Sequence, residues 1–133
     1  EEELPWEIKV EYPDDERNIL ETIASTLGQS KPVGINYQRK VYNTNGRNGN
    51  HASIIVGQKM NNNKCVFIVR NTYGHCSCND GRYEQTHWEG CSEKPDNYNE
   101  SIDCDSASGH MLIPRDELLD NLSSITYLEE KSD

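Results

Sequence analysis

The sequence predicts an α+β fold that combines antiparallel strands with one N-terminal amphipathic helix and a cysteine-rich loop. Three observations predict it. One early segment has apolar residues at helical spacing, and several later segments are short and apolar. Most of the five cysteines crowd into a stretch rich in Gly, Asn and Ser. With 33% hydrophobic residues in a chain of 133, we expect residues 1–133 to form a single domain or a fragment of one.

The predicted helix covers residues 14–27. Asp14, Asp15 and Glu16 supply an N-cap and an acidic first turn, and Gly28 stands where a helix should end. The apolar residues between them recur every three or four positions: Ile19, Leu20, Ile23, Ala24 and Leu27. This spacing places them on one face of an amphipathic helix.

The segments after the helix are short, apolar and bounded by polar residues, as strands are. The expected strands are residues 33–38, 52–56, 66–70, 111–113 and 125–128. A short helix is expected at residues 115–119, because Pro114 precedes them and proline is favoured in the first turn of a helix.

Two of these strands flank a polar segment, residues 59–64, and this arrangement predicts a β-hairpin. If the hairpin is symmetric about Asn61, then His51 lies directly opposite Asn71. Directly opposite residues have Cβ atoms about 4.5 to 5.5 Å apart. We therefore expect the imidazole and the carboxamide to be neighbours at the open end of the hairpin, on one face.

A histidine beside a carboxamide can serve as a general base. In the Cys-His-Asn variant of the catalytic triad, the amide oxygen accepts the N–H of one ring nitrogen. The other ring nitrogen is then left to activate a thiol. The alternative is that His51 and Asn71 are ordinary polar residues at the edge of a loop.

The residues around this pair resemble the papain and cathepsin family of cysteine peptidases. In that family the catalytic histidine opens a strand ending in Val-Gly, as residues 50–57 do, and the orienting asparagine opens an Asn-Ser-Trp-Gly motif similar to residues 71–74. Residues 31–35 look like the family's Gly-Pro-Val strand, and residues 109–114 are similar to the closing segment of bacterial members. The resemblance implies a papain-like C-terminal half domain of β-barrel type.

By this resemblance His51 is the general base and Asn71 its orienting residue. The backbone around Asn50 would hold the substrate main chain beside the scissile bond. Ala52 and Asn36 would line the main specificity pocket. Tyr73 stands where the family has a tryptophan, so it would shield the catalytic pair from water less completely than an indole.

The chain departs from the family at the nucleophile, which there lies in a Gln-x-x-x-x-x-Cys-Trp motif. No such motif precedes residue 15. Cys65 lies inside a predicted strand, where we expect a small buried hydrophobe. The other cysteines follow the asparagine motif or lie far downstream: Cys76, Cys78, Cys91 and Cys104.

Three explanations for the absent nucleophile remain open. The chain is one product of a cleaved or truncated peptidase, or a half-domain with a binding role, or it receives the nucleophile from a partner. We favour the first, because residues 5–8 look like mid-domain sequence and because a half barrel would expose apolar surface that its missing lobe should cover. The same exposure predicts self-association of the isolated segment, by strand exchange for example.

The expected function is therefore part of a papain-like cysteine peptidase that hydrolyses peptide bonds, with the nucleophilic cysteine on a missing N-terminal half. This chain alone would be inactive. The alternative is a non-catalytic module, derived from a papain-like fold, that binds peptides through main-chain hydrogen bonds in a groove beside the hairpin.

Charge and cysteine content narrow the partners and the compartment. A formal charge of −10 repels phosphate backbones and anionic lipids, so neither nucleic acid nor membrane is an expected partner. Disulfides would stabilise the cysteine-rich loop, although four cysteines allow three pairings. We favour disulfides over a zinc site at His75-Cys76-Ser77-Cys78, because the paired two-residue spacing of zinc motifs is lacking. No metal or other cofactor is expected, and the location is secreted or periplasmic.

Overall fold

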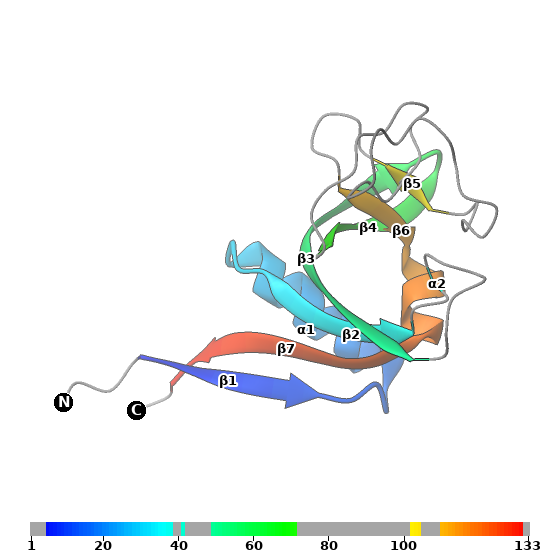
Figure 1. Cartoon of the computed structure of the whole chain (residues 1–133). Helices are drawn as coiled ribbons and strands as arrows, with labels where there is room; N and C mark the ends of the chain where they lie inside the picture. Colours follow the sequence, from blue (N-terminus) through cyan, green and yellow to red (C-terminus); the bar gives the residue numbers. More distant parts are fainter. Residues whose placement is uncertain (1–4, 39–40, 42–48, 72–101, 105–109, 132–133) are drawn as a thin grey trace, which may run out of the picture.

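The computed structural model describes residues 5–38, 41, 49–71, 102–104 and 110–131. In these residues seven strands form one antiparallel sheet with the order β1-β7-β2-β3-β4-β6-β5 (Figure 1). The elements, in chain order, are β1 (Trp6–Glu11), α1 (Glu16–Gly28), β2 (Val33–Gln38), β3 (Asn50–Asn61), β4 (Lys64–Asn71), β5 (Asp103–Cys104), β6 (Met111–Pro114), α2 (Arg115–Asp120) and β7 (Leu122–Glu130).

The predicted α+β class and the N-terminal helix are confirmed. Since β5 has two residues, the other six strands make up the body of the sheet. The sheet curls from β1 towards β6 (Figure 1). It is open, because no pairing among the described residues joins β1 to β5. Neither described helix is long and apolar enough to span a membrane.

Helix α1 begins two residues later and ends one residue later than the predicted range 14–27, with Asp15 as its N-cap and Gly28 as its last residue. The Asp15 carboxylate accepts hydrogen bonds from the backbone N–H groups of Arg17 (3.1 Å) and Asn18 (3.5 Å), which have no partner within the helix. Ile19 and Ile23 are buried on the face of the helix that packs on the sheet. They join one core cluster with residues of the strands and of α2, including Val33, Ile35, Tyr37, Ile55, Phe67, Val69 and Leu118.

The β3–β4 hairpin exists, but the predicted register is wrong. Asn62 and Asn63 form a two-residue turn with φ of 51° and 65°, so both strands run further towards the turn than the sequence suggested. Positive φ at both central residues is typical of a type I′ turn, and asparagine tolerates that conformation well. The register also shifts between Ile55 and Gly57, where a bulge adds a residue to β3.

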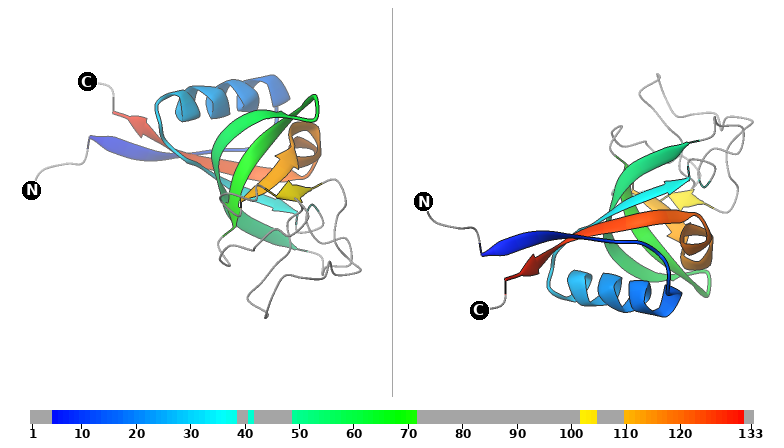
Figure 2. Two further views of the ribbon diagram at one scale, coloured as in Figure 1. Left: turned by 90° about the horizontal axis from the view of Figure 1, so that it is seen from above. Right: turned by 90° about the horizontal axis from the view of Figure 1, so that it is seen from below.

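The sheet contains two strands that the sequence analysis does not predict, β1 and β5. β1 pairs with β7 along its whole length, from Trp6 opposite Glu130 to Glu11 opposite Ile125. Figure 2 shows this β1–β7 ribbon extending past the other strands and past α1. Most of residues 5–8, the segment interpreted as mid-domain sequence, thus belongs to an edge strand of the sheet.

Candidate functional site

His51 is the second residue of β3, and its side chain is only 4% exposed. Burial alternates along the start of this strand, so His51 lies on the same face as Ser53 and Ile55, towards the core. Its Cα partner across the sheet is Tyr37 of β2. The position of the imidazole is therefore determined by two central strands and not by a loop.

Tyr37 of β2 makes two kinds of side-chain contact with β3. Its ring meets the His51 imidazole edge to face, with centroids 5.8 Å apart and an interplanar angle of 86°. Its hydroxyl is 2.9 Å from Ser53 Oγ in a hydrogen bond that either oxygen can donate. The result is a buried polar cluster of Tyr37, His51 and Ser53 within an otherwise apolar core.

Of this cluster, the sequence predicts His51 as a site residue but neither Tyr37 nor Ser53. A signal was available, because alternation along residues 33–38 and 51–56 places Tyr37 and Ser53 on the core face. A buried hydroxyl needs a hydrogen-bond partner. Two buried hydroxyl residues on neighbouring strands therefore point to a contact between them.

Asn71, the last residue of β4, does not lie directly opposite His51. Its Cα partner in β3 is Ser53, two residues further along that strand. The shift in register beside Gly57 and the two-residue turn together account for the difference from the predicted pairing. His51 and Asn71 are instead diagonal neighbours across the hairpin.

The three predicted substrate-binding residues lie near the start of β3 and on β2. Asn36 and Ala52 are Cα partners, and both are exposed on the face opposite His51. Asn50 is exposed at the beginning of β3, and its carboxamide oxygen accepts a hydrogen bond from Ser123 Oγ at 3.0 Å. The structure thus brings Asn36 and Ala52 together, but on the other side of the sheet from the imidazole.

Tyr73 lies outside the described residues, as do Cys76, Cys78 and Cys91, and so does the side chain of Cys104. Cys65 is a free cysteine and is half-buried, where the sequence predicted a buried one. It pairs with Met60, roughly 30 Å along β3 from His51. Cys65 is therefore too far along the hairpin to serve His51.

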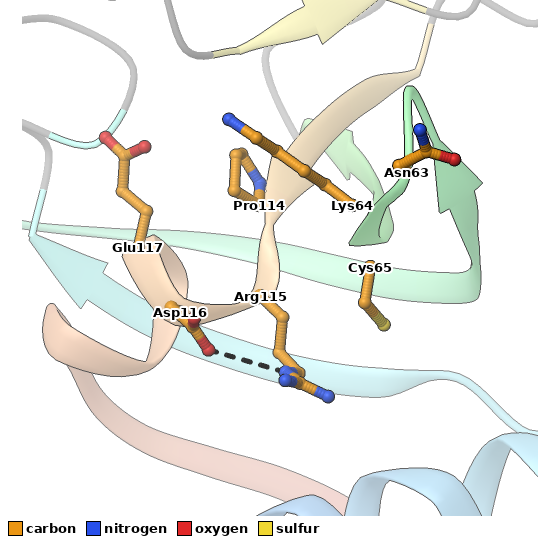
Figure 3. A pocket seen from close by; sticks show the side chains of 7 residues that line it. All are labelled: Asn63, Lys64, Cys65, Pro114, Arg115, Asp116 and Glu117. Atoms are coloured by element: carbon orange, nitrogen blue, oxygen red, sulfur yellow. Dashed lines mark hydrogen bonds and ion pairs between the residues drawn. The ribbon is translucent and has the colours of Figure 1, made fainter.

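A pocket of about 470 Å³ lies beside Cys65, at the turn end of the hairpin. Figure 3 shows its lining, in which side chains near the hairpin turn face the start of α2: Asn63, Lys64, Cys65, Pro114, Arg115, Asp116 and Glu117. The lining carries two basic and two acidic side chains, and Arg115 Nε is 3.4 Å from an Asp116 oxygen. The pocket therefore has no uniform charge and is remote from His51.

A second polar cluster joins β1, α1 and β7. The Tyr127 hydroxyl donates to Glu11 at 2.6 Å, and the Thr22 hydroxyl donates to the same carboxylate at 3.3 Å. Burial, this hydrogen bond and the charges of Glu11 and Glu129 raise the pKa of Tyr127 above its ordinary value. Within the described residues no group of three or more His, Cys, Asp or Glu side chains is arranged to hold a metal ion.

Comparisons of the chain with models of known protein families, with curated proteins and with solved structures find no match.

Proposed function

We propose that this chain is the C-terminal half of a papain-like cysteine peptidase, an enzyme that hydrolyses peptide bonds. We propose with it that the fold is a papain-like half domain of β-barrel type. The observation that supports it most is the position of His51, buried at the start of a central strand in an open, curled antiparallel sheet. A helix and a strand precede it and an asparagine-ended strand follows it, in the order that the sequence motifs imply.

In this proposal His51 acts as the general base towards a cysteine thiol that lies outside this chain. One ring nitrogen of His51 takes the thiol proton, and the imidazolium later gives a proton to the leaving amine. The edge-to-face contact with the Tyr37 ring, whose hydroxyl is hydrogen-bonded to Ser53, restricts the plane of the imidazole.

Asn71 orients the imidazole by accepting the N–H of the other ring nitrogen. Its register position is diagonal to His51, and diagonal neighbours across an antiparallel pair are about 7 to 8 Å apart, within reach of long side chains. A carboxamide fixes one tautomer without adding a full negative charge. In that tautomer the other ring nitrogen serves as the base towards the thiol.

The peptide substrate is bound by residues that flank this pair. The backbone at Asn50 holds the substrate main chain beside His51, and the exposed side chains of Ala52 and Asn36 line the specificity pocket on the opposite face of the sheet, which the peptide reaches around the start of β3. Tyr73 shields the His51–Asn71 pair from water. The complete enzyme works outside the cytoplasm, where disulfides stabilise its cysteine-rich loop.

The role of Asn71 is testable on this chain by nuclear magnetic resonance of the His51 ring nitrogens, assigned by their loss in His51→Ala. We expect one dominant tautomer in the native protein. Asn71→Ala should produce a mixture of both tautomers, because the ring loses its acceptor. The matched control Asn36→Ala removes a carboxamide from β2 and should leave the spectrum unchanged. An identical tautomer ratio in Asn71→Ala would contradict the proposed orientation.

The catalytic role is testable in the full-length reading frame, assayed for peptide hydrolysis that a thiol-directed epoxide inhibits. We expect His51→Ala to lower kcat by about 10² to 10⁴-fold, the usual contribution of a general base. Asn71→Ala should lower kcat by a smaller factor, and the exposed-site control Lys59→Ala should have no effect. Hydrolysis that survives His51→Ala would exclude the proposed base. A full-length protein that binds peptides without cleaving them would favour the non-catalytic module.

A further inference from the structure

Strand β1 forms one edge of the sheet, and one of its sides is free of any described strand. The backbone N–H of Lys131 donates to the carbonyl of Pro5 at 2.9 Å, so Pro5 directs its carbonyl towards β7. Backbone groups alternate sides along a strand. Trp6, Ile8 and Val10 therefore direct their N–H and C=O groups away from β7, towards the free edge.

The same three residues carry the exposed apolar side chains of β1. Glu11 contacts Thr22 of α1, so the odd-numbered residues face the helix and the even-numbered ones face the opposite side. Ile8 is 71% exposed, and Val10 and Trp6 are exposed beside it. Leu128, the partner of Ile8 in β7, is exposed as well. The strand thus combines an exposed apolar stripe with backbone groups that no described strand pairs. Of this stripe, only the Trp6 ring has a described cover, the Lys31 ammonium 3.5 Å from its centroid.

We infer that the occupant of this edge is β1 of a second copy of the chain, paired antiparallel about a two-fold axis at Ile8. In this register Ile8 faces Ile8 of the second copy, and Trp6 faces its Val10. Each of these pairs exchanges two backbone hydrogen bonds, since all three residues have outward N–H groups. Pairs of aromatic and β-branched residues across strands are favourable contacts.

Charge complementarity favours this register over the two neighbouring ones, which are centred on Lys9 and on Glu7. Glu7 and Lys9 already form an ion pair within β1, with Lys9 Nζ and a Glu7 oxygen 3.4 Å apart. With Ile8 on the axis, Glu7 of each copy faces Lys9 of the other, and four charges of alternating sign lie together. Centring the pair on Lys9 would oppose Lys9 to Lys9 and Glu7 to Glu11. Centring it on Glu7 would oppose two carboxylates, and like charges directly opposite are unfavourable.

The geometry also closes at two copies. A two-fold interface uses the same patch on both partners, so each β1 edge is satisfied once and no further copy can add there. The other end of the sheet is β5, whose two residues offer little edge for pairing. This inference goes beyond the proposed peptidase role and does not depend on it.

The test is the molar mass of the chain in solution, measured by sedimentation or light scattering at physiological salt over a range of concentrations. We expect a dimer in the native protein. Glu7→Lys alone opposes two lysines to each other, and Lys9→Glu alone opposes two carboxylates, so each variant should be a monomer. Mixing the two variants should restore a heterodimer, because every cross-strand pair is then of opposite charge. The double variant Glu7→Lys with Lys9→Glu should again form a homodimer.

A backbone variant tests the edge itself. Ile8→Pro removes an N–H that points away from β7, so the β1–β7 pairing is retained while the dimer is lost. Circular dichroism should confirm the fold of each variant. Lys59→Glu, a change at an exposed residue of β3, serves as the charge control. Native protein that stays monomeric up to about 1 mM would overturn the inference and leave the edge to a different strand. A dimer unaffected by the charge variants would overturn it too, because association would then use another surface.

Discussion

The hydroxyl groups of Tyr37 and Ser53 link two central strands inside the core. Tyr37 is fully buried and Ser53 nearly so, which means that neither hydroxyl readily exchanges its partner for water. A buried polar group that loses its hydrogen-bond partner carries the cost of its desolvation. This contact therefore contributes both to the stability of the sheet and to the setting of His51.

We expect Tyr37→Phe to lower the free energy of unfolding by about 1 to 3 kcal/mol, because the Ser53 hydroxyl stays buried without this partner. Ser53→Ala should have a similar effect for the reciprocal reason. The double variant should cost less than the sum of the two, since both remove the same contact. Urea denaturation of the three variants measures this coupling. Strictly additive effects would show that the two hydroxyls do not interact.

Tyr127 should make the stability of the protein depend on alkaline pH. Its pKa is raised in the folded state, so the neutral phenol is stabilised by folding. This stabilisation is complete below the unfolded pKa of about 10 and is lost as the pH rises above it towards the higher folded value. Tyr127→Phe should lower the free energy of unfolding near neutral pH by about 0.5 to 1.5 kcal/mol, through loss of the bond to Glu11.

The measurement is the difference in unfolding free energy between the native protein and Tyr127→Phe, taken by chemical denaturation from about pH 8 to 11. The difference should be constant at the lower end and shrink at the upper end. A difference that does not change over this range would contradict the role of the phenol.

At the scale of elements, local signals determined which predictions succeeded. Helix α1 is predictable because its apolar spacing, its Asp15 cap and Gly28 all indicate a helix over nearly the same residues. The existence of the β3–β4 hairpin is predictable for a similar reason. Its register is not, since the run of asparagines offers several turn positions and the bulge beside Gly57 has no clear sequence signal.

Strand β1 shows a different limit of prediction. Residues 6–11 alternate between apolar and charged side chains, as a strand should, but the partner strand β7 lies far along the chain. A local pattern does not reveal such a partner. The same limit applies to the site residues. His51 can be predicted from its local sequence context, whereas the contact between Tyr37 and Ser53 depends on the β2–β3 register.

The hairpin turn provides a test at this scale. Asn63 has a φ of 65°, a conformation that costs most residues with a Cβ atom about 1 to 2 kcal/mol. Asn63→Gly should therefore keep or raise the stability, and Asn63→Ala should lower it by about 1 kcal/mol. Thermal unfolding of both variants compares them with the native protein. Equal stability of the glycine and alanine variants would argue against a positive φ in solution.

At the scale of the whole molecule, one curled sheet carries both His51, the proposed base, and the β1 edge, the proposed dimer interface, at different places. His51 lies inside, at the start of a central strand, whereas β1 lies at the edge of the ribbon that extends past the body (Figure 2). The formal charge of −10 opposes association of two copies over long distances. At physiological salt this repulsion is screened beyond about 8 Å, so the short-range pairing of Glu7 with Lys9 decides the register.

The pairing of β1 with β7 also bears on how the protein is synthesised. The ribosome makes β1 before all the other described strands and β7 after them, yet these two are neighbours in the sheet. Pairing between strands so distant in sequence is slow, and it leaves apolar segments uncovered on a growing chain. We therefore expect β1 to stay without its β7 partner in the nascent polypeptide until residue 130 has left the ribosome.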